Sequence, residues 1–89
     1  MNYLHYDLGQ KPSGEIVEVT LSGNAANVRL MDNHNFNNYR SGRKHKYYGG
    51  YVKKSPVRLA IPHSGHWYIV IDLGGYEGTV NASVRTIKG

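Results

Sequence analysis

Cysteine is absent from the chain, which excludes a disulfide framework, a thiolate metal site, an iron–sulfur cluster and a cysteine nucleophile. Acidic residues are also scarce, six against eleven lysines and arginines, so the net charge is +5. The longest continuous apolar run is Trp67–Ile71, far short of the ~20 residues that a membrane-spanning helix needs. No signal-like segment opens the sequence. We therefore expect a basic, soluble protein of the cytoplasm that does not enter a membrane.

The 89 residues leave room for one small domain, which we assign to residues 1–89. Apolar residues make up 39% of the chain, enough for a modest core. Between clusters of glycine, asparagine and serine lie runs in which apolar and polar residues alternate, the pattern of a strand with one solvated face. The residues expected to face inward are Val17, Val19 and Leu21, then Ala26, Val28 and Leu30, then Val57, Leu59 and Ile61, and finally Val80, Ala82 and Val84.

One run differs from the others because it is apolar at every position. Trp67–Ile71 is typical of a central strand that is covered on both faces. Turns are expected at Pro12–Gly14, Ser22–Asn24, Pro62–Gly65 and Gly74–Gly75. The sequence therefore predicts an all-β fold, a compact sandwich or jelly-roll-like barrel of about six to eight short, mainly antiparallel strands.

The segment at about 32–54 has no clean period and is predicted to be a long basic loop rich in tyrosine, glycine and asparagine. Asp32 is suited to cap a short helix that reaches Tyr39, but the asparagines that follow are poor helix formers. Long loops in compact domains are usually functional or mobile. The segment is therefore the first place to look for a binding site.

Charge and aromatic rings coincide in this region. No acidic residue occurs between Asn33 and Ile71, whereas seven of the eleven basic residues do. Cations neutralise anions, tyrosine rings offer faces for stacking, and glycines let a backbone approach a ligand. We therefore expect a binding module for a polyanion or an acidic protein surface, with candidate residues Arg40, Arg43, Lys44, Lys46, Tyr47, Tyr48, Tyr51, Lys53 and Lys54.

Three other interpretations remain open. The lysines alone are explained by solubility and by protection of strand edges. The tyrosines could instead anchor a protein–protein interface or a homodimer. A carbohydrate-binding accessory domain would use the tyrosines or an exposed Trp67.

Catalysis has no support in the sequence. His63 and His66 have H-x-x-H spacing but lack further ligands at a recognised spacing, so no metal site and no cofactor are predicted. Asp72 precedes a glycine pair and is expected to accept hydrogen bonds from backbone amides of that turn. Glu18 is expected on a solvated strand face. The expected protein is not an enzyme.

Four stretches together resemble a family of bacterial proteins. They are Asn24–Asp32, Tyr47–Gly50, Ser55–Val57 and Gly65–Gly75. Their combination is similar to domain of unknown function 1883, over essentially the whole chain. The resemblance implies a bacterial source and a single β-rich domain. It carries no known activity, ligand or functional residue.

Overall fold

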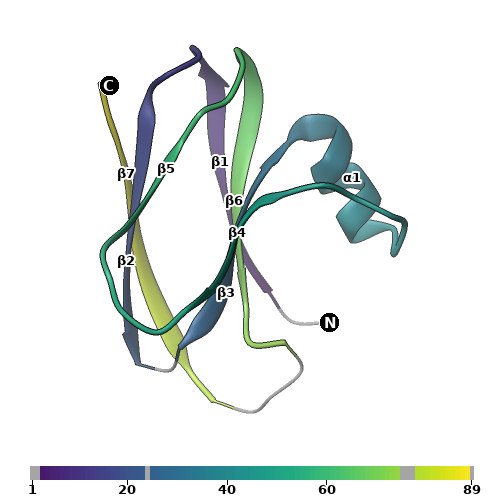
Figure 1. The fold of residues 1–89 in the computed structure, drawn as a ribbon. Coiled ribbons are helices and arrows are strands. Elements are labelled where there is room, and N and C mark those ends of the chain that lie inside the picture. Colours follow the sequence, from purple (N-terminus) through teal and green to yellow (C-terminus); the bar gives the residue numbers. More distant parts are fainter. Residues whose placement is uncertain (1–2, 24, 75–77, 89) are drawn as a thin grey trace.

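The computed structural model describes residues 3–23, 25–74 and 78–88. Seven strands and one helix follow one another along the chain (Figure 1): β1 (Tyr3–Lys11), β2 (Ile16–Gly23), β3 (Ala26–Asp32), α1 (Asn33–Arg40), β4 (Tyr48–Val52), β5 (Val57–Ala60), β6 (Gly65–Asp72) and β7 (Val80–Ile87). Asn24 and Gly75, both predicted to lie in turns, are outside the described residues. The described residues contain no helix with the length and hydrophobicity that a bilayer crossing requires.

The strands form two antiparallel sheets, one of four strands in the order β1-β6-β3-β4 and one of three in the order β5-β2-β7. Figure 1 shows the two sheets as layers, with α1 on the side of the four-stranded sheet that faces away from the other. The predicted all-β sandwich is thus confirmed.

The main core lies between the sheets and uses the predicted alternation. Val17 and Val19 of β2 face Val28 and Leu30 of β3, all with no exposed surface, and Trp67 of β6 is 1% exposed. Each of these side chains loses its contact with water, which supplies about 1.5–3 kcal/mol per large apolar residue. The alternation in the sequence therefore predicted the inward faces of these strands correctly.

The prediction that β6 is covered on both faces is also confirmed. Trp67, Ile69 and Ile71 belong to the core between the sheets. Val70 points to the other side, where it packs with Met31 of β3 and with Phe36 and Tyr39 of α1. The helix therefore shields the part of the outer sheet face that is most apolar.

The predicted loop at 32–54 is wrong in two places, because it contains α1 and β4. The Asp32 side chain caps the helix by accepting a hydrogen bond from the backbone N–H of Asn35 at 2.9 Å. Phe36 and Tyr39 lie on one face of the helix and bury that face on the sheet. Cap and burial outweigh the poor helix propensity of the asparagines.

Glu18 lies on the outward face of its sheet, as expected, but its own side chain is covered by two arginines that are themselves exposed. Its side chain is 7% exposed. From the central strand β2 it pairs with Arg58 of β5 at 2.9 Å on one side and with Arg85 of β7 at 2.6 Å on the other. Hydrogen bonds from Arg85 and Arg58 hold the pKa of Glu18 below its ordinary value. The carboxylate is tolerated on this central strand because both neighbouring strands bring it a cation.

Candidate functional site

The basic segment 41–47 is fastened to α1 along its length. The backbone N–H of Gly42 donates to the Tyr39 carbonyl at 3.2 Å, and that of Arg43 donates to the Asn38 carbonyl at 2.8 Å. Further on, the backbone N–H of Lys46 donates to Oδ1 of the Asn35 side chain at 2.8 Å. The backbone is therefore held at Lys46 and directly before Lys44, while the side chains of both lysines stay exposed.

A groove of about 680 Å³ lies between α1 and this segment. Every side chain that lines it is a lysine, a histidine or an amide, and none is a carboxylate; they are His34, Asn35, Asn38, Lys44, His45 and Lys46. Lysines carry positive charge, and imidazole and amide N–H groups can donate hydrogen bonds. The groove is therefore chemically suited to anionic groups.

Aromatic and cationic side chains connect the groove to the sheet. The ring of His45 meets the ring of Tyr39 edge-on, with 5.2 Å between centroids, and lies 5.9 Å from the ring of Tyr47. On the sheet, the guanidinium of Arg29 sits 5.0 Å from the centre of the Tyr47 ring. One face of Tyr47 is thus already covered by Arg29, which leaves less of that ring for stacking on a ligand.

Asp72, at the end of β6, holds both Tyr39 and Arg29 in place. Its carboxylate accepts hydrogen bonds from Asn27 at 3.0 Å, from the Tyr39 hydroxyl at 2.9 Å and from the backbone N–H of Gly74 at 2.9 Å, and it pairs with Arg29. The Gly74 bond confirms the predicted role in the turn. The other three partners, from α1 and β3, were not predicted.

The electrostatics of this network favour a charged carboxylate. Burial works to raise the pKa of Asp72, but the hydrogen bonds from Asn27, Tyr39 and Gly74, with the charge of Arg29, hold that pKa below its ordinary value. Burial and the bond to Asp72 raise the pKa of Tyr39. The hydroxyl therefore stays protonated and donates to the carboxylate.

All nine candidate residues are exposed, but they do not form one surface. Arg40, Arg43, Lys44, Lys46 and Tyr47 gather at the end of α1 and in the segment after it. Lys53 and Lys54 follow β4, whose five residues span about 17 Å of extended chain. The structure therefore separates seven of the nine candidates into two groups at opposite ends of β4, and Tyr48 and Tyr51 lie within the strand.

The tyrosines of β4 point to opposite sides of the sheet. Tyr48 pairs with Leu30, whose side chain faces the core between the sheets, and its ring centroid lies 6.3 Å from that of Trp67. Tyr51 pairs with Asn27, on the outer face. Of the two glycines between them, Gly49 serves the fold, because a Cβ on Gly49 would collide with the carbonyl oxygen of Val28.

Trp67 is unsuited to carbohydrate stacking. The side chain is 1% exposed, and its indole N–H donates to the backbone carbonyl of His63 at 2.9 Å. The interpretation that relied on an exposed Trp67 is therefore wrong.

The histidines of the H-x-x-H pair have separate surroundings. His66 lies 2.6 Å from the carboxylate of Asp7, whereas the ring of His63 packs 4.9 Å from that of Trp67. Across residues 3–23, 25–74 and 78–88, no three histidine, aspartate or glutamate side chains gather in a way that could hold a metal ion.

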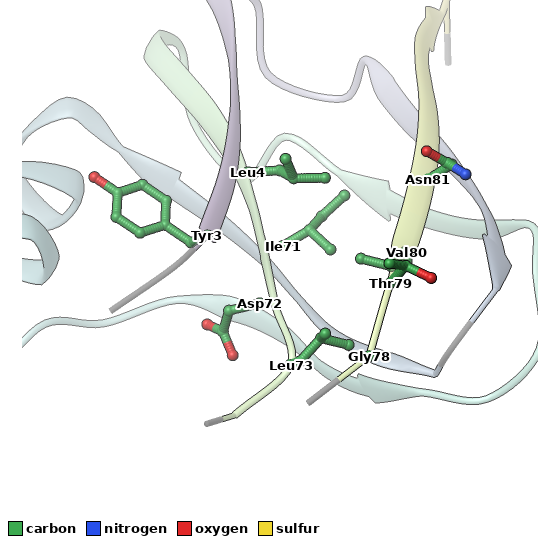
Figure 2. Close-up of a pocket in the computed structure, with 9 residues that line it drawn as sticks. All are labelled: Tyr3, Leu4, Ile71, Asp72, Leu73, Gly78, Thr79, Val80 and Asn81. Carbon is green, nitrogen blue, oxygen red and sulfur yellow. The ribbon is translucent and has the colours of Figure 1, made fainter. Parts of the chain in front are cut away.

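A second hollow, of about 320 Å³, lies at the end of the sandwich between β1, β6 and β7, and Figure 2 shows the residues that line it. Its lining is mainly apolar and contains no lysine, arginine or histidine: Tyr3, Leu4, Ile71, Asp72, Leu73, Gly78, Thr79, Val80 and Asn81. Both carboxylate oxygens of Asp72, its one charged group, are already engaged as described. This hollow therefore offers little for recognition of an anion.

Comparison with known proteins gives a family and no function. The family model described as Domain of unknown function (DUF1883) matches residues 1–89, so the chain belongs to this family. No curated protein and no solved structure matches the chain.

Proposed function

We propose that this member of the family is a non-enzymatic binding module that holds phosphate or sulfate groups of a polyanion in the groove beside α1. The observation that carries the proposal is the lining of the groove. The helix α1 contributes His34, Asn35 and Asn38, the segment after it contributes Lys44, His45 and Lys46, and no carboxylate is among the lining residues. A site of this composition attracts anions and offers nothing that repels them.

The surroundings add to the positive potential. Arg40 and Arg43 are exposed beside the groove, and the sequence from residue 33 to residue 71 holds no acid. Two carboxylates that contact α1, those of Asp32 and Asp72, already accept hydrogen bonds from protein donors. Clustered charge of one sign raises the local concentration of a charged ligand and speeds its association.

Order in the segment supports binding in a second way. Because hydrogen bonds to Tyr39, Asn38 and Asn35 already fix the backbone from Gly42 to Lys46, little further ordering of the main chain is needed when a ligand binds. A preorganised site loses less conformational entropy on association than a mobile loop does.

The test measures fluorescence anisotropy of labelled heparin and labelled single-stranded DNA, at low and at physiological salt. The groove variant is Lys44→Ala/Lys46→Ala. Its matched control is Lys11→Ala/Lys88→Ala, which removes the same charge from β1 and from the end of β7. We expect the groove variant to bind at least about tenfold more weakly and the control to bind like the wild type.

Salt dependence provides the second readout. Each phosphate contact that is lost lowers the slope of log K against log salt by roughly one unit, so the groove variant should show a shallower slope. Equal weakening in both variants would mean that overall charge alone attracts the polyanion. The basic segment would then be a solubilising surface.

A further inference from the structure

We propose that the free edge of β4 binds an extended acidic peptide, which adds to the four-stranded sheet as a fifth strand. This inference does not rest on the groove function, although Lys46 lies near both sites. The four observations that support it are the position of β4, its composition, the lysines at its ends and the placement of its tyrosines.

β4 is the last strand of its sheet. In the strand order it follows β3, and among the described residues it pairs with β3 alone. The outer side of such a strand carries backbone N–H and C=O groups without a strand partner, and these can pair with another chain.

The composition of β4 leaves this edge unprotected along the strand itself. Proteins commonly block free edges with charged residues or prolines inside the strand. Tyr48–Val52 contains neither. Tyr51 is 63% exposed and Tyr48 is 50% exposed, the largest exposed fractions among the bulky apolar side chains of the described residues. Aromatic side chains of this kind are frequent anchors at protein interfaces.

Lysines stand at both ends of β4 and select the charge of the partner. Lys46 precedes the strand by two residues, and Lys53 and Lys54 follow it directly. A peptide that pairs along β4 would bring its two ends close to these cations. Acidic residues at both ends would be attracted, whereas basic residues would be repelled.

The same lysines argue against a second copy of the chain as the partner. In an antiparallel pair of two β4 strands, Lys53 and Lys54 of one copy would approach Lys46 of the other. Like charges placed opposite each other destabilise strand pairing. A nucleic acid lacks the alternating amide donors and acceptors that an edge strand pairs with. An acidic peptide can form hydrogen bonds with the free backbone groups of β4 and can also pair with the lysines at its ends.

The tyrosines extend the contact to both faces of the sheet. Tyr48 lies on the side of the core and Tyr51 on the outer side. Side chains alternate between the two faces of a strand. A bound peptide would therefore place side chains of one face against Tyr48 and side chains of the other face against Tyr51. Alternating apolar or β-branched residues between the acidic ends are the best fit.

The probe is a labelled peptide Glu-Glu-Val-Thr-Val-Thr-Glu-Glu, with binding followed by anisotropy. Two N-methylated forms provide the matched control, one modified on the valines and the other on the threonines. Backbone N–H groups of alternate residues point to opposite sides of a strand, so only one set can bond to β4. We expect one form to bind at least about tenfold more weakly and the other to bind like the parent. Equal affinities for the two forms would overturn the inference.

Variants of the protein separate this site from the groove. Lys53→Ala/Lys54→Ala should weaken binding of the peptide at least about fivefold, whereas Lys11→Ala/Lys88→Ala should leave it unchanged. Amide hydrogen exchange should slow on peptide binding within β4 and not within β1, the edge strand on the other side of the sheet. Exchange in β4 that is unchanged by the peptide would contradict strand addition.

The two proposals fail independently. Heparin binding that is lost in Lys44→Ala/Lys46→Ala supports the groove whatever the peptide does. If the peptide forms show no difference while heparin still binds, the edge proposal falls and the groove proposal stands.

Discussion

The hydroxyl of Tyr39 donates a hydrogen bond of 2.9 Å to the carboxylate of Asp72. This bond joins the last turn of α1 to the end of β6, and both residues are at most 5% exposed. The helix that carries the basic segment is thereby fixed to the most deeply buried strand of the sheet.

Replacing Tyr39 with phenylalanine should therefore loosen α1. The change keeps the ring and removes one donor from a buried charged acceptor, so we expect a loss of about 1–2 kcal/mol of unfolding free energy, measured by urea denaturation. Tyr47→Phe is the matched control, because the Tyr47 side chain is 43% exposed. An equal effect of the two changes would show that the Asp72 bond contributes nothing particular.

Acid should weaken the fold through Asp72. Its pKa in the folded protein lies below the ordinary value of 3.8, so its contribution to stability is present above that value and is lost as the pH falls through the lower, folded pKa. Urea midpoints measured between about pH 6 and about pH 3 should fall steeply at the acid end. Asp72→Asn should be less stable at neutral pH and should flatten that fall.

Glu18 and Asp7 also have lowered pKa values, so part of the acid effect comes from them. The relevant quantity is the difference between the wild type and Asp72→Asn. If the two proteins lose stability in parallel as the pH falls, Asp72 does not contribute to the acid sensitivity.

Two adjacent glycines of β4 should respond differently to alanine. Gly49 has a φ of +121°, and a Cβ there would meet the Val28 carbonyl, so Gly49→Ala should cost about 1–3 kcal/mol of unfolding free energy. At Gly50 a Cβ would meet nothing within 4 Å, and Gly50→Ala should change stability by no more than about 0.5 kcal/mol. Similar unfolding midpoints for both variants would contradict this account of how β4 sits on β3.

Trp67 should report a buried site that no ligand reaches. It is the one tryptophan of the sequence, so all tryptophan fluorescence of the protein comes from this side chain. We expect weak quenching by acrylamide and no change of the emission maximum when heparin or oligosaccharides are added, because the side chain is 1% exposed. Strong quenching in the folded protein would restore the form of the carbohydrate interpretation that relies on Trp67.

The sandwich could be predicted because its strands obey a local rule. Val28 and Leu30 alternate with Asn27 and Arg29, and this period of two assigns the faces of β3 without knowledge of its neighbours. Asp32 could likewise be recognised as a helix cap. The helix itself was missed because its stability comes from Phe36 and Tyr39 packing on the sheet.

The polar network could not be predicted, because its members are distant in the sequence. Asp72 meets Arg29 across 43 positions, and Glu18 meets Arg85 across 67. A single sequence shows each of these residues as an ordinary polar position. The candidate residues were located by charge and aromatic content, which gave their identities but not their division into two groups by β4.

Since β3 and β4 are adjacent antiparallel strands, α1 and the basic segment together form an enlarged hairpin connection between them. That connection brings its own apolar cover, Phe36 and Tyr39, for the patch that Met31 and Val70 would otherwise expose. The lining of the groove and this apolar cover are therefore encoded in one uninterrupted stretch of chain, whereas Asp72, which holds Tyr39, comes from β6. Replacing that stretch could change the chemistry of the groove while the two sheets keep their pairing, provided that each replacement supplies equivalent cover for the patch and keeps a partner for Asp72.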